Sequence, residues 1–446
     1  MLRILRVVAP VALVVTFAAA TPPARAENLI DIYRLAQQND PAFQAAEATY
    51  RADSEILPQA RSALLPAIGA TADRTRTETS QAAPGVAFTL EGSTTYYSNE
   101  YGVRLAQPLF DYPAYKQYGQ AKESVARAEL EFAVAQQDLL LRSARAYFTV
   151  LAAIDNLELA QAEKTALARQ LDLARARLDV GLGTVTDLYE AEARYKSTEA
   201  SEIEAVNALE DARQALEQLI GQPPPALNPL AADMPMLKPD PPNIDAWLEE
   251  ALANNLSILT EQRTVAIAVE EVNVQRGGHY PTVDLVASDS HFEQDGSLSG
   301  GAVERDNTII GVQLSVPLFQ GGFVSSRTAE ARQRLEAARR SLESTRRAAV
   351  REARDAFRSM ATQTSLVSAL QQAVTASESA LEGKVKGFEA GLNSNIEVLD
   401  AQRDLFLAKR NYAQSRYDYV LNLFRLEQVA ARLDVGSLER VNQWLQ

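Results

Sequence analysis

The chain has 446 residues, of which 46% are hydrophobic, and it carries a formal net charge of -14 and no cysteine. The acidic balance argues against nucleic acid as a partner, since phosphate binding requires a surface rich in Lys and Arg. The absence of cysteine excludes disulfides, thiol catalysis and cysteine-bound metals, and the length allows several domains.

Residues 1–26 are predicted to form a secretory signal peptide. Two arginines precede an apolar run at 7–20, and Ala24-Arg25-Ala26 has the small-x-small pattern of a cleavage site. The run contains a proline and is shorter than the hydrocarbon core of a bilayer demands, and no later stretch is long and apolar enough to cross it. We therefore expect a mature chain that begins at Glu27, with no transmembrane helix and, without a cysteine at the cleavage site, no lipid anchor.

The rest of the chain is predicted to be two copies of one unit, at 27–222 and 243–446, joined by a Pro-rich linker at 223–242. Missing N–H groups and ring clashes exclude a helix through the linker. Short landmarks recur in the same order in both copies, far further apart than the units of a solenoid. The paired landmarks are Asn28-Leu29-Ile30-Asp31 with Asn243-Ile244-Asp245-Ala246, Leu105-Ala106-Gln107-Pro108-Leu109-Phe110 with Leu314-Ser315-Val316-Pro317-Leu318-Phe319, and Val180-Gly181-Leu182 with Ala390-Gly391-Leu392.

Each copy is predicted to begin with a helix, at about 29–62 and 244–275, and to continue into a β-hairpin, at 66–110 and 281–319. Apolar residues alternate along the second strand of each hairpin: Tyr101, Val103, Leu105 and Leu109, then Ile310, Val312, Leu314, Val316 and Leu318. Such a strand suits an ordinary sheet on a soluble domain, but a length of about ten residues with one apolar face also suits a tilted span of a bilayer. Four strands cannot close a barrel, so a membrane sheet requires several chains to share one, and this pattern leaves two or three chains open.

A long helix follows each hairpin, at 113–179 and 322–389, and a shorter return helix follows it, at 187–221 and 396–434. The long segments contain no internal proline and are rich in good helix formers. Apolar residues recur every seven positions, as in coiled coils: Val125, Phe132, Leu139 and Ala146, then Leu335, Leu342, Ala349 and Ala356. We expect two rods, each roughly 100 Å long.

The tips between these helices lie at 180–186 and 390–395. Gly181 and Gly391 are expected to take the left-handed conformation that ends a helix, with a Thr or Ser capping the next helix. Two carboxylates follow each tip three residues apart, on one helix face: Asp187 with Glu190, and Glu397 with Asp400. In a symmetric assembly they would form rings that favour cations; the alternative is that they are first-turn acids stabilised by the helix dipole.

The duplicated order of motifs resembles the TolC family of bacterial outer-membrane efflux and secretion channels, from Asn28 to the C-terminus. The motifs are Ala60-Arg61-Ser62-x-Leu64-Leu65-Pro66, Ala146-Tyr147-Phe148-x-Val150-Leu151, Val180-Gly181-Leu182 with Thr186-Asp187, Pro317-Leu318-Phe319-Gln320-Gly321-Gly322, and Glu397-Val398-Leu399-Asp400-Ala401. The resemblance implies a mainly α chain with a transmembrane β part: a homotrimer with a twelve-stranded β-barrel in the outer membrane, four strands per chain, above a periplasmic α-helical tunnel.

The resemblance also implies a function. It predicts a passive exit duct in outer-membrane lipid for a tripartite efflux pump or a type I secretion system. A periplasmic adaptor and an inner-membrane pump or ABC transporter would dock around Gly181 and Gly391. Glu397 and Asp400 match family positions that line a periplasmic constriction.

One departure from the family concerns the gate at the tips. Thr186 and Asp187 match residues that hold the tip shut in similar channels, but Phe388 and Asn393 replace the Tyr and Arg that they contact there. Phe has no hydroxyl and Asn no charge. We hypothesise that the closed state of this chain is held differently or less tightly.

No enzyme site, cofactor or metal is predicted. The only histidines, His279 and His291, have no cysteine or spaced carboxylate cluster beside them, and phosphate-binding, dinucleotide and nucleophile-elbow motifs are missing. The alternative to a channel is a periplasmic coiled-coil adaptor or envelope spacer. Such a protein needs helical hairpins but no paired amphipathic strands.

Overall fold

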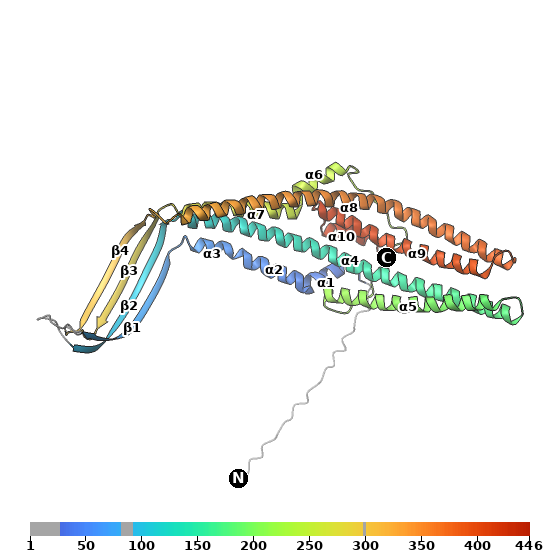
Figure 1. Ribbon diagram of the computed structural model, residues 1–446, viewed down its shortest axis with the longest axis horizontal. Coiled ribbons are helices and arrows are strands. Elements are labelled where there is room, and N and C mark those ends of the chain that lie inside the picture. Colours follow the sequence, from blue (N-terminus) through green and yellow to red (C-terminus); the bar gives the residue numbers. More distant parts are fainter. Residues whose placement is uncertain (1–26, 82–91, 298–299) are drawn as a thin grey trace, which may run out of the picture.

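The computed structural model describes residues 27–81, 92–297 and 300–446. The predicted signal peptide, 1–26, lies outside the described residues. A four-stranded sheet stands at one end of an elongated array of helices (Figure 1). In chain order the elements are α1 (Leu29–Asn39), α2 (Pro41–Ser54), α3 (Ile56–Ser62), β1 (Ala67–Gln81), β2 (Gly92–Phe110), α4 (Tyr112–Asp179), α5 (Val185–Ile220), α6 (Ile244–Asn254), α7 (Leu256–Gly277), β3 (Thr282–Gln294), β4 (Val303–Ser315), α8 (Phe323–Glu389), α9 (Asn395–Val429) and α10 (Val435–Asn442).

The sheet is antiparallel, in the order β1-β2-β3-β4, so each strand pairs with its neighbours in sequence. Among the described residues, β1 and β4 have no strand partner on their outer edges. The second hairpin ends at Ser315, earlier than the predicted 319, because Pro317 has no N–H for the ladder. Because no described strand pairs with the outer edge of β1 or of β4, the sheet is open at both edges.

One face of the sheet is apolar and exposed. The register aligns Ile68, Leu105, Ala287 and Ile310 in a single row across the four strands, and Ile68 and Ile310 are 70% and 76% exposed. Val312 and Leu314 extend the apolar face along β4 towards the helices. The opposite face carries small and polar residues, among them Gly102, Arg104, Ser288, Gly311 and Gln313. The predicted alternation is confirmed.

The two long helices are confirmed as α4 and α8, with 68 and 67 residues. At about 1.5 Å per residue each is roughly 100 Å long. The side chain of Asp111 caps the start of α4 by accepting a hydrogen bond from the Ala114 amide at 2.9 Å. The helices form two helical hairpins, the first of α4 packed on α5 and the second of α8 packed on α9. The shorter helix α7 lies between α4 and α8.

The helices predicted at 29–62 and 244–275 are not continuous, which corrects that expectation. Asp40 takes an extended conformation and its side chain caps α2, because a residue that precedes a proline is disfavoured in the α region. Asn255 caps α7 in the same way, accepting hydrogen bonds from the amides of Ser257 and Ile258. Side-chain caps thus break both helices at these two residues, and the first helix is interrupted again at Glu55, whose side chain makes no cap.

The main core lies at mid-length, where α1, α4, α9 and α10 meet the linker. As predicted, the linker at 223–242 contains no helix, yet Leu230 and Met234 are buried within it. Tyr147 donates a hydrogen bond to the carbonyl of Asn228 at 2.7 Å, and Tyr419 donates one to the carbonyl of Leu237 at 3.0 Å. The linker is a strap fixed across the helices.

Candidate functional site at the helical tips

Both tips are built around one glycine. Gly181 and Gly391 have φ angles of 77° and 76°, so the predicted left-handed conformation is confirmed. The next amide closes each turn: Leu182 donates to the carbonyl of Arg177 at 2.8 Å, and Leu392 to that of Gly387 at 2.7 Å. The two tips are therefore near copies of each other.

The return helices begin with side-chain caps, as predicted. Thr184 and Asp187 form a reciprocal capping box at the start of α5, in which the Thr184 hydroxyl donates to Asp187 Oδ2 at 2.6 Å. Ser394 caps α9 by accepting from the Glu397 amide at 3.4 Å. The carboxylate of Asp187 thus lies in the first turn of α5, where the helix dipole favours negative charge.

The other residues predicted to act at the tips, Thr186, Asn393 and Phe388, have different surroundings. Thr186 is exposed and makes no side-chain hydrogen bond with any described residue. Asn393 turns back onto its own helix, where its Nδ2 donates to the carbonyl of Lys384 at 3.3 Å. The ring of Phe388 lies against Arg177 of α4, with the guanidinium carbon 4.2 Å from the ring centroid. Of the two replaced positions, only Phe388 reaches the other hairpin.

Further contacts join the two hairpins within the chain. Gln170 of α4 donates to Asn395 Oδ1 at 2.5 Å, and Asn395 Nδ2 donates to the carbonyl of Asp187 at 3.4 Å. A hollow of about 230 Å³ between the tips is lined by Arg177, Asp187, Phe388, Asn395 and neighbouring residues. The hairpins also meet through an apolar cluster, in which Leu399 of α9 packs with side chains of α4 and α5: Leu167, Leu171, Ala174 and Ala191. Separating the hairpins would therefore expose apolar side chains as well as break these polar contacts.

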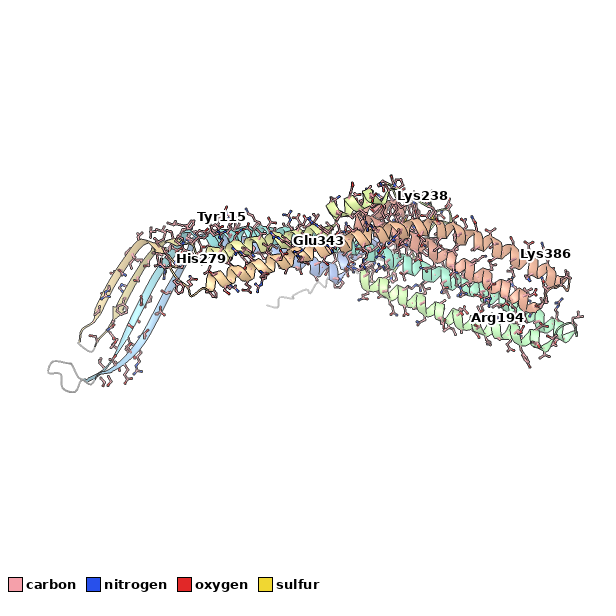
Figure 2. All side chains as sticks on the ribbon, turned by 45° about the horizontal axis from the view of Figure 1, so that its top comes forward. Tyr115, Arg194, Lys238, His279, Glu343 and Lys386 are labelled. Atoms are coloured by element: carbon pink, nitrogen blue, oxygen red, sulfur yellow. The ribbon has the colours of Figure 1, made fainter. Side chains whose placement is uncertain are left out.

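The carboxylates of the predicted constriction are both paired. Glu397 lies 2.9 Å from the Nζ of Lys384 on α8. Asp400 lies 2.7 Å from Arg194 on α5 and 3.5 Å from Arg403 on its own helix. Figure 2 shows Arg194 on the helix opposite the α8–α9 tip. The side chains of Glu397 and Asp400 are 45% and 41% exposed, so solvent screens these pairs.

Sequence reasoning missed Lys384 and Arg194 as partners of these acids. Lys384 and Glu397 lie across the tip from each other, and Arg194 and Asp400 belong to different hairpins. Residue spacing predicts contacts only between side chains of the same helix, so it predicts neither of these two contacts. Glu190 has one buried carboxylate oxygen with no hydrogen-bond partner among the described residues.

The other end of the molecule has the features of a membrane surface. Exposed aromatic residues gather where the sheet meets the helices, as at a membrane–water interface: Phe110, Tyr115, Phe319 and Phe323, of which Figure 2 labels Tyr115. No helix in the described part of the chain is both long and apolar enough to cross a bilayer. An open sheet with an apolar face, continued by two long helical hairpins, defines a subunit of a membrane channel with a helical extension.

Comparison with known proteins specifies the class. The family model for outer membrane efflux proteins matches residues 32–222 and 247–432. Outer membrane protein TolC of Vibrio cholerae is 31% identical over 94% of each chain. Alkaline protease secretion protein AprF of Pseudomonas aeruginosa is 30% identical over 93% of this chain and 86% of its own. The crystal structure of outer membrane protein VceC from Vibrio cholerae superposes with a TM-score of 0.74 at 21% identity, covering 90% of this chain and 95% of that one.

The chain belongs to the outer membrane efflux protein family. It is an outer-membrane channel of the efflux and secretion class, and the resemblance drawn from its motifs is confirmed. Nothing supports the alternative of an adaptor or spacer. The relatives and structural neighbours are channels rather than enzymes, and no group of three or more potential metal ligands occurs among the described residues.

Proposed function

We propose that three copies of this chain close one twelve-stranded barrel. The observation that carries the proposal is the open sheet: β1 and β4 expose unpaired edges beside an apolar face. Lipid offers no hydrogen bonds, so an unpaired strand edge in a membrane costs several kcal/mol per backbone group, and pairing β4 with β1 of another copy removes that cost. The choice of three copies over two comes from the resemblance to the family.

In this assembly each repeat, 27–222 and 243–446, supplies one barrel hairpin and one tip. The barrel and helices form a passive duct from the periplasm to the exterior. A periplasmic adaptor and an inner-membrane pump or ABC transporter dock at the tips around Gly181 and Gly391. TolC and AprF are similar to this chain at almost the same identity, so we propose both small molecules and unfolded proteins as cargo.

We further propose that Glu397 and Asp400 line the constriction at the tips. They stand one turn apart on α9, next to the tip, and both remain half-exposed. Three copies would supply six carboxylates around the axis. Lys384 and Arg194 partly compensate their charge in the closed state. Opening, which moves the α8–α9 hairpin away from α5, would break the Arg194–Asp400 pair and leave the carboxylates free to attract cations.

The test is single-channel conductance of the purified protein in a planar bilayer, beside a variant with Glu397→Gln and Asp400→Asn. We expect discrete cation-selective openings in the wild type and a loss of selectivity in the variant. Unchanged selectivity would mean that residues other than Glu397 and Asp400 line the constriction. A protein that never inserts or conducts would contradict the channel itself.

A further inference from the structure

Four arginines lie along one side of α8, and we call them the arginine stripe: Arg347, Arg351, Arg354 and Arg358. Their spacing of four, three and four residues places them on a single helix face. Buried residues two positions further along repeat that spacing: Ala349, Ala353, Ala356 and Met360. Two residues turn an α-helix by about 200°, so the arginine stripe lies on the opposite face of α8 from these buried residues.

The arginine stripe has few acceptors within the chain. Arg351 and Arg354 donate no side-chain hydrogen bond to, and form no ion pair with, any residue that the structure describes. Arg347 and Arg358 bond only to groups within one turn of α8. Like charges three and four residues apart repel each other. The stripe therefore lowers the stability of an isolated chain, and an acidic partner would relieve this.

The arginine stripe also borders an open hollow of about 640 Å³. Leu252 of α6 and Val350 of α8 supply its apolar lining, and Glu343 of α8 also lines it. Figure 2 shows Glu343 midway along the molecule, far from both the sheet and the tips. The hollow is thus separate from the constriction and from the membrane surface.

The opposite margin of the chain is acidic. Residues 199–220 of α5 contain six acids and one base, Arg213, the acids being Glu199, Glu202, Glu204, Glu210, Asp211 and Glu217. Leu209 and Ala212 are buried in the direction of α4. Glu210 and Asp211 are each two positions from one of them, so both face outward. We call Asn207, Glu210, Asp211 and Gln214 the acidic edge.

We propose that the arginine stripe binds the acidic edge of the next copy in the assembly. The inference rests on the shared barrel proposed above. In Figure 1, α8 continues the β4 margin of the molecule, whereas α1–α3 and α5 lie along the β1 margin, and α1 packs on α5. When β4 of one copy pairs with β1 of the next, these margins come together. Arg guanidinium groups then meet carboxylates, which they bind in a planar, two-pronged geometry.

The absence of cysteine from the chain permits a direct test by single-cysteine labelling. Arg354→Cys is treated with a maleimide in the intact detergent-solubilised assembly and after heat dissociation in SDS. We expect labelling to be at least about tenfold slower in the assembly, equivalent to about 1.4 kcal/mol of protection. The control is Lys238→Cys, an exposed position on the strap (Figure 2), which should react equally in both states.

Two further experiments distinguish direct contact from burial. Arg354→Cys combined with Gln214→Cys should be joined by a flexible bismaleimide into species of two and three chains, which neither single variant forms. Arg351→Glu with Arg354→Glu should lower the temperature at which the assembly dissociates, and adding Glu210→Arg with Asp211→Arg should raise it again. An intact, conducting assembly in which Arg354→Cys labels freely would overturn this inference and leave the channel standing. A chain that never assembles would overturn both.

Discussion

The Arg194–Asp400 pair gives the sharpest prediction about gating. Both side chains are about 40% exposed, and an exposed ion pair of this kind is worth about 0.5 kcal/mol. In the proposed assembly of three chains, three copies of the pair act together, so losing them would remove about 1.5 kcal/mol from the closed state. We therefore expect Arg194→Ala to raise the ratio of open to closed channels about tenfold.

The assay is the open fraction of single channels in planar bilayers at low and high salt. The effect of Arg194→Ala should shrink as salt increases, because ions screen an exposed pair in the wild type too. Arg175→Ala is the matched control, since Arg175 is exposed on α4 near the same tip and forms no ion pair with any described residue. An open fraction unchanged by Arg194→Ala at low salt would refute the reasoning.

Three other predictions concern the membrane face, a buried tyrosine and the tip. Ile310→Arg should cost about 2 to 4 kcal/mol at the lipid face and reduce insertion into outer-membrane vesicles, whereas Gln313→Arg on the opposite face should insert normally. Burial raises the pKa of Tyr419 to about 12, and this raised folded-state pKa contributes stability that is present below the ordinary value of about 10 and lost as pH rises towards 12. Urea unfolding should therefore show a steeper loss of stability above pH 10 for the wild type than for Tyr419→Phe. By pH 12 the folding constant of the wild type should have fallen roughly 50-fold further than that of the variant. Gly391→Ala should strain the left-handed tip by about 1 kcal/mol and lower the thermal midpoint, whereas Gly383→Ala, inside α8 with no atom within 4 Å of the added Cβ, should raise it.

The sequence contains most of the fold in local patterns. Alternation along β2 and β4 reports one apolar face because successive side chains point to opposite sides of a strand. Gly181 and Gly391 report the tips because a left-handed residue there suits glycine above all. The breaks at Asp40 and Asn255 are also local, since both are side-chain caps. These breaks were missed because each segment was predicted as one continuous helix.

The contacts at the tips were not predictable in the same way. Arg194 and Asp400 lie on different hairpins, and the axial alignment of one hairpin against the other depends on packing along the whole of α4 and α9. The sequence singled out Phe388, but its contact with Arg177 emerges only from that alignment. Sequence periodicity identifies which face of a helix is buried. The residues that this face contacts on another helix are known only from the tertiary structure.

The central claim is that the open sheet is completed by other copies of the chain. Native mass spectrometry of the protein extracted from outer membranes in mild detergent tests it most directly. The account predicts one dominant species containing three chains, the number that gives twelve strands from four-stranded sheets. A dominant single chain would contradict a shared barrel, and a dominant pair would replace the twelve-stranded barrel with an eight-stranded one.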